Sequence, residues 1–430
     1  MPDLSRRDVI AGSAMLTSAA ALPPVPAGTL DSVAADLDRY IGFGSKQAGG
    51  PGDTACGAWL AAEIERAGYA VERQAFEAPF FTPTRADLVC GSAKAAVWPQ
   101  PIVIPTPPAG IAGRVVRVDP TGQASAALAD AIALVDLPTA RWSTALAKPI
   151  REPIAAAFAK GAKAVVVITN GPTGKIIALN ADGRRPMFAG PVALLAPEDA
   201  GPFLGAAMRG ERATLTVTGQ GGTRPAFNFV GRIDRGRKTW LAVSTPRSGW
   251  YGCAGERGPG VAVWLMLARW ASRALGDHNL AFICNSGHEY EYLGASEAMK
   301  AIAPKPADTR FWLHLGANVG ARDWHDGTNK PLPSADPQRF LAVSPALLPL
   351  CREVFAGLAG LEMPYSSADL SAGELTEIMA AGFKPAAGVF GIHRFHHVAE
   401  DDARCVSART VAEAADAFQT LLARVAAAPA

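Results

Sequence analysis

The sequence predicts an α/β fold in which a mostly parallel central sheet is flanked by helices and a second, small α/β domain rich in strands is inserted. In the second half of the chain, wholly apolar strand patterns alternate with amphipathic helix patterns, which is typical of a parallel sheet covered on both faces. A proline-rich stretch near residue 100 precedes a block with its own strands and helix. At 430 residues, the chain is also long enough for two domains.

The first domain starts with helical periodicity. Apolar residues recur at three- and four-residue spacing over 55–67, after a plausible cap at Asp53 and Thr54, and a strand is expected over 70–76. Proline then dominates residues 98–108. This shift in composition predicts that the first domain is interrupted there.

The inserted block is expected to span 106–222, so that the larger domain comprises residues 28–105 and 223–430. Within the block, a helix ends near residue 162, and strands are expected over 113–118, 131–135, 163–168 and 213–217. Residues 221–224 are predicted to form the linker that leaves the insert.

The larger domain resumes after this linker. Strands are predicted over 230–233, 240–244 and 280–284, and helices over 260–274 and 408–427. The final helix would pack its apolar stripe against the sheet.

The N-terminus has the pattern of a twin-arginine export signal. Arg6 and Arg7 precede an uncharged run over 11–22, and small residues that suit a cleavage site follow near Ala27. We therefore expect residues 1–27 to be a signal peptide, and the folded protein to be periplasmic or secreted. The apolar run is too short for a stable membrane anchor, so no membrane span is expected after cleavage.

Composition limits the partners of the protein. Hydrophobic residues make up 49% and charged residues 19% of the chain, and the formal net charge is +2, so no nucleic-acid partner is indicated. The six cysteines are widely spaced, which fits neither a metal knuckle nor a dense disulfide framework but leaves room for one or two disulfides. Oligomeric state is left open.

Several segments carry a resemblance to a known family. They are Gly49 to Thr54 with the following helix, Ala226 to Gly231, and three segments further along that hold Glu256, Glu289 and His397. The chain resembles the co-catalytic zinc exopeptidases, which include bacterial leucyl aminopeptidase, glutamate carboxypeptidase and glutaminyl cyclase, with an inserted protease-associated domain. This resemblance spans nearly the whole mature chain and implies the zinc-exopeptidase fold.

The resemblance also implies a reduced metal site. Glu256, Glu289 and His397 fall on the ligands of the second zinc, whereas the two ligands that belong only to the first zinc fall on Thr245 and Ala317. Neither of those side chains can replace the missing ligand. Three nitrogen and oxygen ligands with an open position suit one catalytic zinc, so a single zinc ion is expected.

Other site residues follow from the same resemblance. His288 falls on the general-base position and could move a proton, and Arg247 falls where the family has a carboxylate, so that its charge could replace the lost cation. Glu374 falls on a substrate-side carboxylate. Trp250 and Tyr251, together with Trp324, lie near predicted strand ends and could form an aromatic pocket.

Two classes of function stay open. The first is an exported aminopeptidase-like hydrolase, or a glutaminyl-cyclase-like acyl-transfer enzyme, that acts on a peptide or small amide through one zinc. The second is a catalytically inactive, metal-free periplasmic binding protein, in which Glu289 and His397 are buried residues satisfied by ordinary hydrogen bonds. Metal content separates the two classes.

Overall fold

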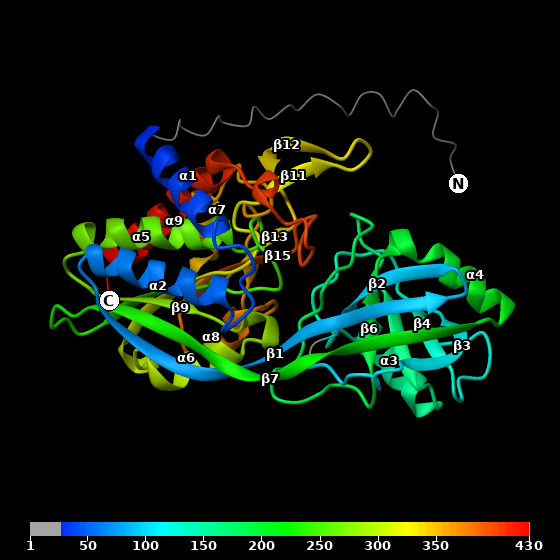
Figure 1. Cartoon of the computed structure of the whole chain (residues 1–430). Coiled ribbons are helices and arrows are strands. Elements are labelled where there is room, and N and C mark those ends of the chain that lie inside the picture. The colour runs from blue at the N-terminus through cyan, green and yellow to red at the C-terminus, as the bar shows by residue number, and fades with distance from the viewer. Residues whose placement is uncertain (1–26, 101, 430) are drawn as a thin grey trace, which may run out of the picture.

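The computed structural model describes residues 27–100 and 102–429. It has two lobes joined by a long two-stranded ribbon (Figure 1). Residues 1–26, which contain the arginine pair and the apolar run of the predicted export signal, lie outside the described part. In the described part of the chain, no helix combines the length and apolar character needed to cross a membrane.

The ribbon consists of β1 (Ala70–Cys90) and β7 (Arg212–Ile233), which pair antiparallel along almost their whole lengths. The sequence predicted two short strands and a linker over 221–224 in the place of β7, and this prediction is wrong. Gly221 lies opposite Phe81, and the residues on either side of it also have partners on β1. Because cross-strand pairing continues through the glycine-rich run, the backbone stays extended there.

The large lobe is built on strands in the order β7-β9-β8-β10-β15-β13-β14. The four central strands, β9, β8, β10 and β15, are mutually parallel. β7 pairs antiparallel with β9, and β13 pairs antiparallel with β15 but parallel with β14. The strand bounds are β8 Trp240–Pro246, β9 Asn279–Asn285, β10 Thr309–Leu315, β13 Arg339–Val343, β14 Tyr365–Ser366 and β15 Ala386–Gly391. The predicted α/β fold with a mostly parallel sheet is confirmed.

Helices cover both faces of this sheet (Figure 1). One face carries α1 (Ala27–Ile41), α2 (Pro51–Arg66), α5 (Gly258–Ala274), α7 (Leu348–Val354) and α9 (Ala408–Ala427). The other carries α6 (Leu293–Ala301) and α8 (Glu374–Ala380). A separate hairpin is formed by β11 (Arg322–His325) and β12 (Lys330–Ala335). The helices predicted over 260–274 and 408–427 are α5 and α9.

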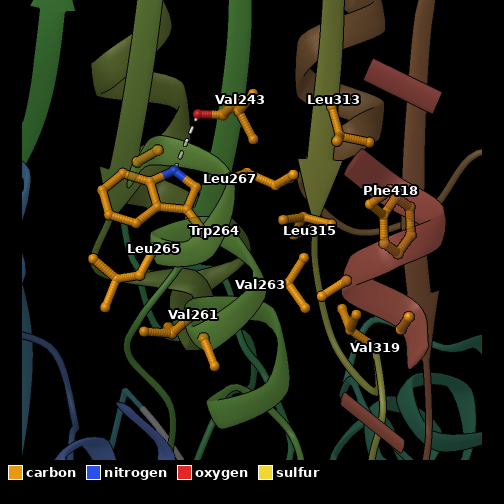
Figure 2. Close-up of a cluster of buried hydrophobic side chains, with 14 of the residues drawn as sticks. Val243, Val261, Val263, Trp264, Leu265, Leu267, Leu313, Leu315, Val319 and Phe418 are labelled. Atoms are coloured by element: carbon orange, nitrogen blue, oxygen red, sulfur yellow. Dashed lines mark hydrogen bonds between the residues drawn. The ribbon is translucent and has the colours of Figure 1, made fainter. Parts of the chain in front are cut away.

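The main core lies between α5 and the sheet (Figure 2). Trp264 of α5 is fully buried, and its indole Nε1 donates to the carbonyl oxygen of Val243 on β8 at 3.2 Å. Valine and leucine side chains from α5 and β10, together with Phe418 of α9, belong to the same buried cluster. Burying each such side chain contributes roughly 1.5–3 kcal/mol, so this face fixes the position of the loop that leads into α5.

The small lobe consists of the far ends of the ribbon and the elements between them, residues 85–218. Its strands are ordered β2-β6-β5-β4-β3-β7, and two hydrophobic clusters cover the faces of this sheet. The bounds are β2 Ala93–Pro99, β3 Ile111–Val118, β4 Ile132–Asp136, α3 Lys148–Ala159, β5 Ala164–Ile168, β6 Val192–Leu195 and α4 Gly201–Arg209. Strand β2 precedes residue 106 yet pairs with β6, and β7 continues past residue 222. The division into two independent domains at these residues stays a prediction.

All six cysteines are buried and free. The one or two disulfides for which the sequence left room are therefore not formed.

Candidate functional site

The candidate site lies at the start of α5, where Glu256, Arg257 and His397 meet. Glu256 and Arg257 end the loop between β8 and α5, and His397 lies in the loop after β15 with a left-handed backbone (φ 58°). His397 Nε2 lies 3.1 Å from Glu256 Oε1, and Arg257 Nη2 lies 2.7 Å from the same oxygen. All three residues are at most 2% exposed. Two of the predicted metal ligands, Glu256 and His397, therefore come together. The Arg257 guanidinium, which was not predicted at the site, contacts the same carboxylate.

The charge of Glu256 is balanced within this group. Burial alone would raise the pKa of its carboxyl, but Arg257 and His397 beside it hold that pKa well below its usual value. The Arg257 guanidinium also donates from Nε to the carbonyl oxygen of Ser248 at 3.1 Å. Glu256 and Arg257 thus form a buried ion pair.

His397 is held from the opposite side by the small lobe. Its Nδ1 lies 2.8 Å from the carbonyl oxygen of Ala178, whose N–H donates in turn to the carbonyl oxygen of His397 at 2.9 Å. Ala178 belongs to a buried run, residues 177–181, that we call the cover segment. One ring nitrogen of His397 therefore faces a carbonyl oxygen and the other faces a carboxylate oxygen.

The cover segment makes further contacts across the lobe interface. Ala181 donates its N–H to the carbonyl oxygen of Glu289 at 3.2 Å, and Asn180 Oδ1 accepts from Trp250 Nε1 at 2.9 Å. Near it, Ser143 of the small lobe lies 3.2 Å from His396 Nε2. The small lobe therefore closes over the candidate site.

Glu289, the third predicted ligand, has its carboxylate bound elsewhere. Its Oε1 accepts from the Ala48 N–H at 2.6 Å, and its Oε2 accepts from the Ser248 hydroxyl at 2.7 Å. Burial raises the pKa of this carboxyl from 4.5 to about 7, although both hydrogen bonds oppose the rise. Ser248 connects the two parts of the site, because its carbonyl oxygen accepts from Arg257.

His288 and Glu374, predicted as a proton carrier and a substrate-side carboxylate, form a pair. His288 Nδ1 lies 3.0 Å from Glu374 Oε1, and Glu374 Oε2 accepts from Asn285 Nδ2 at 2.9 Å. Burial, followed by the nearby Arg257, lowers the pKa of His288. Burial alone would raise the pKa of Glu374, but His288, His314 and Asn285 together lower it.

Arg247 lies in a different buried ion pair. Its Nε is 3.0 Å from Asp53 Oδ1 on α2, and its Nη2 donates to the carbonyl oxygen of Phe227 at 2.7 Å. The side chains of both charged partners are wholly buried. Arg247 therefore ties α2 to the sheet, and its charge is already neutralised by Asp53.

Two groups of buried side chains have the spacing of metal ligands within the described residues. Glu256, His396 and His397 offer atoms within 4.8 Å of one another. His393, Asp401 and Cys405 form the second group. The two groups are neighbours, since Asp401 accepts from the N–H of Glu256 at 3.0 Å. Glu289 belongs to neither group.

The first group does not fit the single zinc that the sequence predicted. A divalent ion about 4 Å from the Arg257 guanidinium would be repelled by on the order of 8 kcal/mol at an effective dielectric of about 20. The rings of His396 and His397 stack at 3.9 Å and 18°, so an ion between them would lie out of both ring planes and off both lone pairs. Both nitrogens of His397 are also occupied by acceptors.

The predicted aromatic residues separate into three environments. Trp250 lines a cavity of about 450 Å³ between the lobes. Tyr251 packs against Trp98 with ring centroids 4.9 Å apart and ring planes tilted by 55°. Trp324 packs against Phe395 away from both. Only Trp250 therefore borders an open cavity.

Sequence reasoning missed the residues that decide the character of the site. Arg257 directly follows Glu256, so the signal is present in the sequence, but the resemblance assigns a role only to Glu256. Asp53 was read as a helix cap, whereas it is the partner of Arg247. The cover segment carries no polar motif, and the contacts of Ala178 use only its backbone.

Comparison with known proteins identifies the fold. No protein-family model and no curated protein matches the chain. Among solved structures, the chain is similar to a zinc aminopeptidase from Bacillus subtilis (15% identity, TM-score 0.71, 94% of this chain and 96% of that one). It is also similar to an aminopeptidase from an Aneurinibacillus strain (19% identity, TM-score 0.66, 92% and 93%) and to a peptidase precursor from Shewanella amazonensis (15% identity, TM-score 0.71, 94% and 93%). The chain has the zinc-exopeptidase fold.

Proposed function

We propose that this chain, which has the fold of zinc aminopeptidases, is a metal-independent binding protein that does not cleave peptides. The observation that carries the proposal is the ion pair between Arg257 and Glu256, at 2.7 Å in a fully buried position. A permanently charged guanidinium stands beside the carboxylate that a zinc ion would need. The metal-free alternative from the sequence is thus favoured over the hydrolase.

Three further features support this choice. Glu289 accepts two hydrogen bonds from the protein, and its pKa of about 7 means that a large fraction of it is protonated at neutral pH. His397 makes contacts at both ring nitrogens. The cover segment is fully packed over the same residues, which leaves no room for a peptide beside them in this conformation.

The competing function is a hydrolase, or a glutaminyl-cyclase-like enzyme, with one zinc. It would require Arg257 to leave Glu256 and Glu289 to leave Ala48 and Ser248. The first step breaks a buried ion pair, and removing one partner of such a pair typically costs about 3–5 kcal/mol. The second step breaks two buried hydrogen bonds to a carboxylate.

An activity assay tests the proposal. The mature chain, purified without chelator, is incubated with leucine p-nitroanilide and with an N-terminal glutaminyl peptide, with and without added zinc. We expect neither hydrolysis nor cyclisation in any condition. Zinc-dependent turnover that disappears in His397→Ala would overturn the proposal and support the single-zinc enzyme.

We further propose that the protein works after export. The support is the arginine pair before an uncharged run in the sequence. Replacing Arg6 and Arg7 by lysine is expected to leave the protein in the cytoplasm, measured by cell fractionation. An unchanged periplasmic yield would contradict the assignment.

A further inference from the structure

We propose that the cavity between the lobes binds a small amphipathic anion, with an apolar body inside the cavity and one carboxylate at its rim. The cavity has a volume of about 450 Å³, within the range of about 300–1,000 Å³ typical of small-molecule sites. The inference deepens the proposed function, on which it rests, by naming a ligand class and a place for it. The place is separate from Glu256 and His397, neither of which lines the cavity.

The walls of the cavity are apolar and aromatic. The ribbon supplies Phe80 and Phe81 from β1, β2 supplies Trp98, and the large lobe supplies Trp250 and Tyr290. Aromatic rings offer large contact areas at a low cost in conformational entropy. An aliphatic or aromatic ligand body is therefore the chemistry that these walls favour.

The large-lobe wall is held in place by contacts among its own side chains and with the cover segment. Trp250 and Tyr290 pack edge to face with centroids 5.5 Å apart, and Trp250 donates to Asn180 of the cover segment. Tyr290 accepts from Gln47 Nε2 at 2.9 Å. Since these side chains are already fixed, little ordering is needed when a ligand binds.

Glycines provide the space on the ribbon side. Gly219, Gly221 and Gly222 of β7 all line the cavity. A Cβ on Gly219 would come within 2.9 Å of Phe81 Cζ, and one on Gly221 within 3.1 Å of Phe81 Cδ2, so the absence of side chains makes room for this ring.

The charge at the rim indicates an anion. Arg184 and Arg185 line the cavity, and among the described residues that line it none is acidic. Arg184 forms an ion pair with Asp182 at 3.0 Å, whereas Arg185 has no salt bridge within the described part of the chain. A guanidinium group beside an apolar cavity can donate two hydrogen bonds to a carboxylate, and among the described residues Arg185 has no acidic partner of its own there.

Calorimetric titration of the full mature chain with decanoate tests the inference. We expect saturable binding of decanoate and at least tenfold weaker binding of decyltrimethylammonium, which has the same chain length and the opposite charge. The double variant Arg184→Glu, Arg185→Glu should bind decanoate at least tenfold more weakly with an unchanged Tm, because both side chains are exposed. Arg151→Glu, an exposed arginine on α3 that does not line the cavity, is the matched control and should bind like the parent.

Equal binding of the cation and the anion, no binding of decanoate, or undiminished binding by the double variant would overturn the inference. A second variant, Phe80→Asp, places a charge inside the cavity and should abolish decanoate binding by the same measurement. Failure of the decanoate titration is distinct from failure of the proposed function, because the titration does not depend on zinc content or turnover. A protein that binds decanoate yet cleaves peptides with zinc would contradict only the proposed function.

Discussion

Glu289 is an acid whose ionisation opposes folding. Its pKa lies near 4.5 when exposed and at about 7 when buried in the folded chain. The stabilisation from holding it protonated is fully present below pH 4.5 and is lost as the pH rises through 7. The difference corresponds to roughly 3 kcal/mol, at about 1.4 kcal/mol for each pKa unit.

The variant Glu289→Gln should therefore lose this part of the pH dependence, since an amide cannot ionise and can still accept from the Ala48 N–H. We expect a higher free energy of unfolding than the parent at pH 8 and a similar value at pH 5, measured by urea unfolding. Glu152→Gln, at an exposed position on α3, should not change the pH dependence. An equal effect of Glu289→Gln at both pH values would show that Glu289 is already ionised in the fold.

Arg257 stabilises the site by neutralising Glu256. In Arg257→Met, the carboxylate stays buried without its cation, so we expect a loss of about 3–5 kcal/mol in the free energy of unfolding. Arg257→Lys keeps the charge and should lose less. Arg66→Met removes only an exposed pair with Glu63 and should change stability by less than about 1 kcal/mol.

If Arg257→Met lowered the free energy of unfolding as little as Arg66→Met does, the ion pair would not hold the site together.

Among single residues, the sequence predicted that Glu256 and His397 meet, because the order of the family segments places them. The sequence could not predict that the Arg257 side chain points toward the carboxylate of Glu256. That direction depends on the loop before α5, where Cys253 has a left-handed backbone (φ 51°), and spacing alone does not encode such a turn.

The cover segment is the element that joins the lobes at the site. In Asn180→Ala, the buried Trp250 Nε1 loses its acceptor, which should cost about 1–3 kcal/mol. Hydrogen exchange should also become faster at the amides of 178 and 181, which donate to the large lobe. Unchanged exchange at those two amides would show that Asn180 does not fix the cover segment.

The β7 strand depends on a glycine at its closest approach to β1. A Cβ on Gly219 would come within 2.2 Å of the carbonyl oxygen of Thr82 and 2.8 Å of Pro83 Cα. Gly219→Ala should therefore lose about 1–3 kcal/mol, as overpacking usually does, measured by thermal unfolding.

Gly201→Ala is the matched control, because no atom lies within 4 Å of a Cβ placed there and a helix tolerates alanine. Equal melting temperatures for the two variants would contradict the tight packing of the ribbon.

The sequence predicted a linker over 221–224 because glycine-rich runs usually break strands. The partner strand 140 residues earlier overrides that local tendency, and single-sequence patterns do not contain such pairing.

For the whole molecule, the fold class could be predicted because burial on both faces of the sheet imposes continuous apolar strands and amphipathic helices on the sequence. The closure of the small lobe over the site could not. It depends on backbone hydrogen bonds such as those between Ala178 and His397, 219 residues apart, which leave no trace in side-chain type. The role of Glu256, Glu289 and His397 as metal ligands therefore stays a prediction of the resemblance.

The Arg257 guanidinium neutralises Glu256 in place of a metal ion. The zinc content of the protein tests this most directly. The mature chain, purified without chelator and dialysed against micromolar zinc and then zinc-free buffer, is measured by inductively coupled plasma mass spectrometry. The parent chain is expected to hold far less than one zinc per chain, and a His397→Ala variant to give the same value. One or more zinc ions per parent chain, lost in His397→Ala, would contradict the account.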